Sequence, residues 1–370
     1  MLYLISIKIG DKMYFFNISM VIVCISFSYF IIRKIHSLEI VKKIKNKYLS
    51  WILSSIMLLI IFIINKFDFF DYDVIIIHFL LFYFILKFIF YLINKFLKKN
   101  INSYILYFLS FLFTVIYLCN GYYLAHYVEE TNHNINTDKN LGVKNFRIVQ
   151  ITDSHIGSTM SGKKFSKYID DINKTNPDIV VLTGDFVDDD TKYQDMIDAT
   201  RGLGNLKTKY GVYYIFGNHD KAYFNYRKFS ENDLKFELEK NNVIIMEDDV
   251  IDINDNIVLI GRRDSNEKRK SIFDLTNSIS KDKYVIVLDH EPNDYENESK
   301  VNVDLVLSGH THGGQLFPIG ELSLLFGIND SIYGLKKIND TNFIVSSGIG
   351  NWRISFKTFA NSEYVVIDIN

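Results

Sequence analysis

The chain has 370 residues, of which 48% are hydrophobic, and a formal net charge of −2. Its length suggests about two domains, and the near-neutral balance excludes the clustered cations that nucleic-acid binding requires. Both cysteines, Cys24 and Cys119, lie inside apolar runs, which excludes a disulfide scaffold and a cysteine-based metal site.

Charged residues are distributed unequally along the chain. Up to His126 there are 13 Lys and Arg against 5 Asp and Glu, whereas the remaining residues carry 28 against 38. The basic part contains four apolar stretches, each close to the ~20 residues that cross a bilayer as a helix. They are about Met13–Ile32, Tyr48–Ile64, Val74–Ile93 and Tyr104–His126. Residues 1–126 are therefore expected to form an all-α transmembrane region of about four helices.

The loops between these stretches predict an orientation. Residues 33–47 contain six Lys and Arg, residues 95–99 contain three, and residues 65–73 contain three Asp and one Lys. Because Lys and Arg accumulate on the cytoplasmic side, the first and third loops are expected in the cytoplasm. The chain then leaves the membrane after His126 on the outer face. We therefore expect a multi-pass membrane protein whose remaining residues are extracytoplasmic.

Two ionisable residues, His78 and Lys87, lie within the third apolar stretch. Such groups are functional candidates by default. No partner charge stands in the other stretches, so packing between helices or snorkelling to the interface is favoured for both.

Residues 127–143 are polar and are expected to form a linker to a second domain, residues 144–370. There, short apolar runs alternate with helical patterns, first strand–helix and later strand–strand, which predicts an α/β or mixed sandwich. The runs "FRIVQIT", "DIVVLTG", "GVYYIFG", "YVIVLD" and "DLVLSG" are typical of buried strands. Phe165, Tyr168, Ile169 and Ile172 follow the spacing of a surface helix.

Five of the predicted strands end in metal-binding residue types. These are Asp153 and His155, Asp185, Asn218 with His219 and Asp220, Asp289 with His290, and His310 with His312. Ligands gather at the carboxyl ends of strands in α/β sheets, and residues i and i+2 of a strand point to one side. Imidazole and carboxylate suit zinc, manganese and iron. The oxygens of Asp185 can bridge two such ions, a pair that generates hydroxide and neutralises a phosphoryl group.

In order and composition these motifs resemble the calcineurin-like metallophosphoesterase family. The pattern D-x-H, G-D, G-N-H-D/E, H and G-H-x-H stands here in five blocks: Asp153-Ser154-His155, Gly184-Asp185, Gly217-Asn218-His219-Asp220, His290, and Gly309-His310-Thr311-His312. The following "HGGQL" and the later "VSSGIG" resemble the membrane-associated branch of that family, in which several spans precede the catalytic domain.

The resemblance implies a fold, cofactors and roles for these residues. The fold is a two-sheet β-sandwich flanked by helices, and the cofactors are two divalent metal ions, Mn, Zn or Fe. One ion is held by Asp153, His155, Asp185 and His312, and the other by Asp185, Asn218, His290 and His310. His219, oriented by Asp220, contacts the phosphate or protonates the leaving oxygen. The glycines after His312 are expected to let the backbone approach the metals.

Other features of this domain had structural as well as functional interpretations. Asp188, Asp189 and Asp190 resemble a fourth acidic motif, but a helix start is favoured, because carboxylates there cap the helix and offset its dipole. Arg262 and Arg263 fit either anion steering or a solvated loop. The apolar run "LFPIGELSLLFGI" after His312 fits either core packing or a rim that meets acyl chains. "GNWRISFKTF" departs from the branch, which often has Pro and Arg after the final glycines.

The expected function is a membrane-anchored phosphoesterase. It hydrolyses phosphate mono- or diesters by attack of a metal-activated hydroxide, with a lipid-linked or cell-envelope substrate favoured and membrane lipids as neighbours. The alternative is a catalytically inactive metal-binding membrane sensor or interaction module, which would keep the metals but be indifferent to His219.

Overall fold

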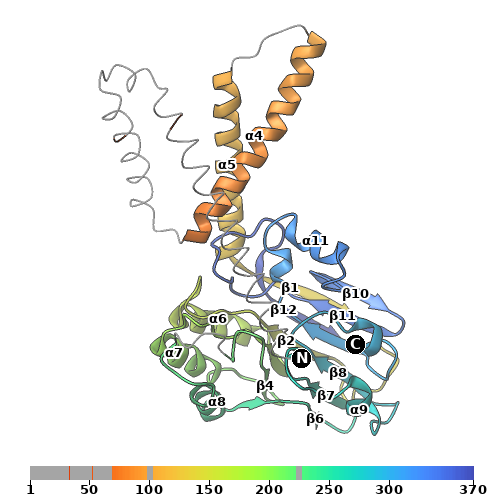
Figure 1. The fold of residues 1–370 in the computed structure, drawn as a ribbon. Coiled ribbons are helices and arrows are strands. Elements are labelled where there is room, and N and C mark those ends of the chain that lie inside the picture. Colours follow the sequence, from red (N-terminus) through yellow and green to blue (C-terminus); the bar gives the residue numbers. More distant parts are fainter. Residues whose placement is uncertain (1–32, 34–51, 53–68, 98–102, 222–226) are drawn as a thin grey trace. The chain divides into compact units, whose positions relative to one another are not determined.

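The computed structural model describes residues 33, 52, 69–97, 103–221 and 227–370 (Figure 1). The first two expected spans and most of the first lysine-rich loop lie outside the described residues. Within them, two helices are long and apolar enough to cross a membrane, α4 (Phe69–Leu97) and α5 (Ser103–His126). They coincide with the third and fourth apolar stretches.

The chain divides into two compact units, residues 1–117 and residues 118–370. In the first unit, the buried His78 ring lies 5.3 Å from the ring of Tyr117 of α5, and its Nδ1 lies 2.7 Å from the carbonyl oxygen of Val74. Lys87 is exposed, with its Nζ 5.8 Å from the ring of Tyr83. His78 thus packs between helices, as expected.

The expected outer loop at residues 65–73 is wrong in its last part. Asp71 and Asp73 lie in the first turns of α4, and both are buried. Carboxylates are favourable at a helix N-terminus because they offset the positive end of the dipole, which explains why an acidic cluster begins this helix.

The second unit contains two six-stranded mixed sheets. The first sheet has the order β1 (Val128–Ile135), β12 (Ser362–Ile369), β2 (Phe146–Ile151), β3 (Ile179–Thr183), β4 (Val212–Ile215), β5 (Val243–Ile245). The second has the order β10 (Gly334–Ile338), β11 (Thr341–Val345), β9 (Leu305–Ser308), β8 (Tyr284–Leu288), β7 (Ile257–Gly261), β6 (Asp249–Asp252). The pairs β12–β2, β10–β11 and β6–β7 are antiparallel, and the others are parallel. This is the expected α/β architecture.

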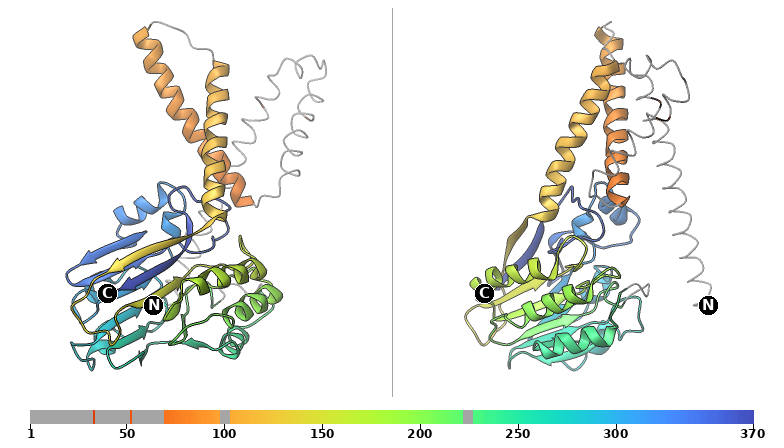
Figure 2. Two further views of the ribbon diagram at one scale, coloured as in Figure 1. Left: turned by 180° about the vertical axis from the view of Figure 1, so that it is seen from behind. Right: turned by 90° about the vertical axis from the view of Figure 1, so that its left-hand side faces the viewer.

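Three apolar layers hold this unit together. Side chains of both sheets, among them Phe146, Val181 and Leu307, meet in the central layer. Helices α6 (Gly162–Lys174), α7 (Tyr193–Leu203) and α8 (Glu231–Lys240) cover the outer face of the first sheet (Figure 2). The short helices α9 (Ile272–Thr276) and α10 (Tyr295–Glu298) cover the second. Strands covered on both faces are apolar at nearly every position, which is why they read as continuous apolar runs.

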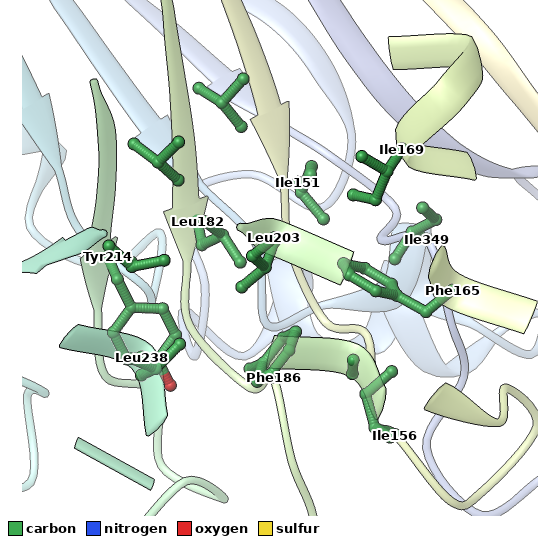
Figure 3. Packing of buried hydrophobic residues seen from close by; sticks show 14 of the residues in the cluster. Ile151, Ile156, Phe165, Ile169, Leu182, Phe186, Leu203, Tyr214, Leu238 and Ile349 are labelled. Carbon is green, nitrogen blue, oxygen red and sulfur yellow. The ribbon is translucent and has the colours of Figure 1, made fainter. Parts of the chain in front are cut away.

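Helix α6 shows how its local sequence produces this packing. Its N-cap Ser161 accepts a hydrogen bond from the backbone N–H of Lys164, satisfying one free donor at the helix start. Phe165 and Ile169 point from α6 into the layer that also contains Ile151 and Leu182 of the sheet (Figure 3). The expected apolar stripe of this helix is confirmed.

The expected linker at residues 127–143 is wrong in its first half, because Val128–Ile135 forms the edge strand β1, paired in parallel with β12. The strand has few apolar residues, so its sequence is typical of a linker. Polar cross-strand contacts stabilise it: Thr131 donates to Glu363, and Tyr364 Oη donates to Glu130 at 3.0 Å. The sandwich therefore begins upstream of residue 144.

Replacing Phe165 by alanine tests the packing of this layer. The fully buried ring fills the space between α6 and the sheet, so Phe165→Ala is expected to lower the free energy of unfolding by ~3–5 kcal/mol. Thermal unfolding of the detergent-solubilised chain measures the loss. Phe236→Ala, at a ring that is 63% exposed on α8, is the control and should change stability by less than ~0.5 kcal/mol. Equal melting temperatures for the two variants would contradict the packing.

Candidate metal centre

The loops after five parallel strands converge at one end of the two sheets. They follow β2, β3 and β4 in the first sheet and β8 and β9 in the second. Parallel strands of one sheet end at the same edge, so side chains far apart in sequence meet there. This convergence brings together all seven residues expected to bind metal: Asp153, His155, Asp185, Asn218, His290, His310 and His312.

The residues lie just beyond the strands, not on them. Strand β2 ends at Ile151 and β9 ends at Ser308, so the predicted i, i+2 alternation along a strand is wrong as the cause of their orientation. Instead the backbone is left-handed at five non-glycine positions: Asp153, His155, Asp185, His310 and His312, with φ between 39° and 68°. This conformation costs of order 1–3 kcal/mol per residue and occurs where the surroundings impose it.

Backbone hydrogen bonds hold these loops in place. The N–H of Asp153 donates to Gly184 O at 3.0 Å, and that of His155 donates to Asp185 O at 3.1 Å. The N–H of His310 donates to the carboxylate of Asp153 at 2.9 Å. These bonds join the loops after β2, β3 and β9 into one connected piece of structure.

The first donor group consists of Asp153, His155 and His312, all buried. The Nε2 atoms of His155 and His312 are 3.1 Å apart, and His312 Nε2 lies 3.6 Å from Asp153 Oδ1. Asp185 Oδ2 lies 3.6 Å from His155 Nε2. These are the four residues that the family resemblance assigned to one ion.

The second donor group consists of Asp185, Asn218, His290 and His310. His290 Nε2 lies 3.3 Å from Asp185 Oδ2 and 3.2 Å from Asn218 Oδ1. His310 Nδ1 lies 3.0 Å from the same Asn218 oxygen. Because Asp185 Oδ2 faces His155 in one group and His290 in the other, its carboxylate is placed between them.

The spacing and chemistry of both groups fit divalent ions. Ligands at ~2.1 Å from one metal lie ~3.0–3.4 Å from each other, and the measured separations fall in or close to that range. Two ring nitrogens 3.1 Å apart, as in His155 and His312, need either a proton or a cation between them. Buried carboxylates with this many acceptor atoms nearby require positive charge to offset their burial.

Hydrogen bonds on the far sides of the rings select the nitrogen that faces each group. His290 Nδ1 lies 2.7 Å from the carbonyl oxygen of Thr183, and His155 Nδ1 lies 3.3 Å from Asp188 Oδ2. His290 thus donates through Nδ1, and both rings present Nε2 to the centre, the arrangement that orients metal-binding histidines.

The charge states of the buried groups follow from their surroundings. Burial, with His290 nearby, lowers the pKa of His310 to about 4, and burial with His155 nearby lowers the pKa of His312 well below its ordinary value. Burial opposes charge on Asp185, but His290 and His155 outweigh it and hold its pKa well below the usual range. At neutral pH His310 and His312 are therefore neutral and Asp185 is ionised, as metal binding requires. Burial opposes charge on His290, but Asp185 outweighs it and raises the pKa of His290 well above its ordinary value.

Asp188 belongs to the site, and the helix-start interpretation of it is wrong. Helix α7 begins at Tyr193, and Asp188 instead lies between two histidines, 3.3 Å from His155 Nδ1 and 3.3 Å from His219 Nδ1. Burial raises the pKa of Asp188, but hydrogen bonds to both histidines outweigh this and lower it. The sequence Asp188-Asp189-Asp190 does not indicate which of the three carboxylates contacts the site.

Asp220 does not orient His219, contrary to expectation. Its carboxylate accepts hydrogen bonds from the backbone N–H groups of Phe186, Val187 and Gly217 at 2.8–3.0 Å. Burial, together with the charge of Asp185, raises its pKa to about 6. Asp220 therefore fixes the loops after β3 and β4, while the ring of His219 lies beside Asp188 and 5.3 Å from that of Trp352.

The glycines that allow close packing beside the donor groups are Gly184 and Gly309, not the expected glycines after His312. A Cβ on Gly184 would lie 2.6 Å from His290 Nδ1, and one on Gly309 would overlap the carboxylate of Asp153. Gly313 and Gly314 instead allow close packing against Ala360 and Gly320. The expectation that these two give the backbone access to metal is wrong.

Arg262 is neither an anion-steering group nor a solvated residue. It is 2% exposed, and its Nη1 donates to Asp289, Asp294 and Glu298 at 2.7–3.0 Å. Arg269 also donates to Asp289. These two arginines bind the carboxylate of Asp289, which explains why Asp289 does not join the donor groups.

A cavity of about 350 Å³ opens over the two donor groups. His219, His310 and His312 contribute polar walls, and the remaining lining includes Ile319, Gly320, Ile332 and Trp352. The loop at residues 346–350 packs against the first donor group, where the N–H of Gly350 donates to Asp153 O at 3.0 Å. The cavity thus combines a charged floor with an apolar side wall.

The α/β fold and the two clustered donor groups together fit a domain that binds divalent metal ions. Residues 146–314 match the sequence model of the calcineurin-like phosphoesterase family. This part of the chain is similar to that family, and it contains all five motif blocks on which the resemblance depends.

Curated relatives agree with this assignment. An uncharacterized metallophosphoesterase of Campylobacter jejuni is 32% identical over 61% of this chain and 59% of its own length. One of Helicobacter pylori is 34% identical over 60% and 58%. A zebrafish (Danio rerio) protein named "transmembrane protein with metallophosphoesterase domain" is 27% identical over 59% and 51%. The chain thus spans about half to three fifths of the length of these relatives.

The contact of Asp188 with two histidines predicts a positioning role. Asp188→Asn keeps the shape but weakens both interactions, so Mn²⁺ binding is expected to weaken by about 10–100-fold. Titration calorimetry on the full chain in detergent measures the dissociation constant. Asp190→Asn, at an exposed neighbour, is the matched control and should bind as the unmodified chain does. Equal affinities of the two variants would show that Asp188 does not orient the site.

Proposed function

We propose that this protein is a membrane-anchored phosphoesterase that hydrolyses phosphate mono- or diesters outside the cytoplasm. The observation that carries the proposal is the pair of donor groups sharing Asp185, with His219 at the wall of the same cavity. Asp153, His155, Asp185 and His312 would hold one divalent ion, and Asp185, Asn218, His290 and His310 the other. When bound, two such ions (Mn, Zn or Fe) supply the Lewis-acid charge that activates water and neutralises a phosphoryl group.

His219 is the residue best placed to assist the leaving group. Its ring lines the cavity, and its backbone N–H donates to Asp185 Oδ1 at 2.8 Å. Burial lowers the pKa of His219, but Asp188 and Asp185 outweigh it and raise the pKa above its ordinary value. A protonated imidazole at this wall can donate a proton to the departing oxygen, which is the role of a general acid.

Membrane anchoring, the outer location and the substrate class are proposed from sequence composition, from a relative's name and from the wall of the cavity. The apolar helices α4 and α5 and the printed name of the zebrafish relative support membrane anchoring. The lysine distribution of the first 126 residues supports an outer location for the second unit. The apolar wall formed by Ile319, Ile332 and Trp352 supports a lipid-linked or envelope phosphate ester as the substrate.

The assay uses the full chain in detergent, with Mn²⁺ and bis-p-nitrophenyl phosphate. We expect turnover that EDTA abolishes and Mn²⁺ restores. His219→Ala is expected to lower kcat by about 10²–10⁴-fold with little change in Mn²⁺ affinity. His133→Ala, at a histidine of the edge strand β1, is the matched control. Tight Mn²⁺ binding without turnover would instead indicate the metal-binding sensor.

The proposed topology has its own test. Fusions of alkaline phosphatase and of green fluorescent protein after Asn370 report the side on which the second unit lies. Because the lysine-rich loops are expected inside, the phosphatase fusion should be active and the fluorescent fusion dark. The reverse pattern would place the unit in the cytoplasm and remove the envelope substrate.

A further inference from the structure

The segment after the metal centre exposes an unusual amount of apolar surface. Residues 317–328, here called the apolar rim, include helix α11 (Ile319–Leu325), which projects beyond the sheets of the second unit (Figure 1). Leu325 and Phe326 are 76% and 72% exposed, and the other exposed apolar side chains are Phe317, Ile319, Leu322, Leu324 and Ile328. Glu321 is the one charged residue among them. Contiguous apolar surface of this kind marks a contact with a protein or a membrane.

The position of the rim is tied to the end of the apolar helix α5. Residues 118–126 of that helix belong to the second unit, where Gly121 O accepts a hydrogen bond from the N–H of Lys357 at 3.0 Å. Ala125 O accepts from Asn351 Nδ2 at 3.0 Å and from Ser362 Oγ at 2.9 Å. The helix end is therefore fixed to the loop at residues 351–362.

The same loop holds the start of the rim. The N–H of Thr358 donates to Gln315 O at 2.8 Å, and Thr358 Oγ1 accepts from the N–H of Phe317 at 2.7 Å. Lys357 binds the end of α5, and the next residue, Thr358, binds the start of the rim. The two attachment points are therefore adjacent in the loop. The rim begins beside the last turn of the apolar helix.

Exposed aromatic residues lie around the end of α5 and on the loop that is attached to it. Tyr122 and Tyr123 at the end of α5, Tyr127 just after it, and Phe359 in the attached loop are all exposed. Tyrosines and tryptophans gather where a membrane-crossing helix leaves the hydrocarbon, because their rings are apolar at one end and polar at the other. A bilayer entered by α5 would therefore have its surface at the level of the rim.

We infer that the apolar rim lies in the interfacial layer of the lipid bilayer that α5 enters. The inference rests on the proposed membrane anchoring. Because the rim has no cation, its binding depends on buried apolar area, not on anionic headgroups, and a zwitterionic bilayer suffices. Ile319 and Gly320 also line the cavity over the donor groups, so the side wall of that cavity meets the membrane. An amphiphilic substrate can then reach the metal centre from the plane of the bilayer.

The test measures contact with lipid directly and does not depend on activity. The full chain, with Cys24→Ser and Cys119→Ser, is reconstituted into phosphatidylcholine nanodiscs after single Leu325→Cys labelling with an environment-sensitive fluorophore. Replacing part of the lipid with a doxyl-labelled phosphatidylcholine is expected to remove about half of the emission. Phe236→Cys, equally apolar and exposed on α8, is the matched control and should respond to iodide in the water but not to the lipid.

A third label, at Phe113 of α5, separates this inference from the anchoring itself. Lipid quenching at Leu325 supports the rim, whether or not Phe113 is quenched. Quenching at Phe113 but not at Leu325 overturns the rim and leaves the anchoring intact, and quenching at neither overturns both. A Leu325 label insensitive to both lipid and iodide would mean that protein, either a second copy or another segment of this chain, covers the rim. That result also overturns the inference.

Discussion

The burial of many metal-binding atoms in one place is the constraint on which the second unit depends. Asp153 and Asp185 are buried side by side with four imidazoles, at separations close to 3–4 Å. In an apolar interior such groups cost several kcal/mol each unless cations or N–H donors offset them. Parallel strands, left-handed loops and glycines at residues 184 and 309 together bring these atoms close despite that cost.

The sequence predicted the ligating residues well because their chemistry is local. Each donor follows a buried apolar run directly, and parallel strands necessarily end together, so the convergence of five short motifs could be inferred without knowing the loops. The backbone conformation could not be inferred. Left-handed φ at Asp153, His155 and Asp185 arises from hydrogen bonds to neighbouring loops, and those partners are distant in sequence.

The wrong predictions share a cause, which is that polar side chains acquire their roles from distant partners. Asp188 resembles a helix cap until His155 and His219 are placed beside it. Arg262 resembles a surface residue until three carboxylates surround it. Strand β1 resembles a linker because its stability comes from pairing with β12, not from its own apolar residues. Apolar periodicity carries none of this information.

One loop connects the metal centre, the end of α5 and the apolar rim, and its rigidity has a physical basis. Lys357 is fully buried, and its Nζ donates to Ser347 O at 2.6 Å, in the segment that closes over Asp153. Burial lowers the pKa of Lys357 to about 7, so this contact is maintained at a real desolvation cost. Its backbone meanwhile binds Gly121 of α5, which has no Cβ to obstruct the approach. This arrangement fixes the donor groups relative to the end of α5 and to the start of the apolar rim, because consecutive residues of one loop bind both.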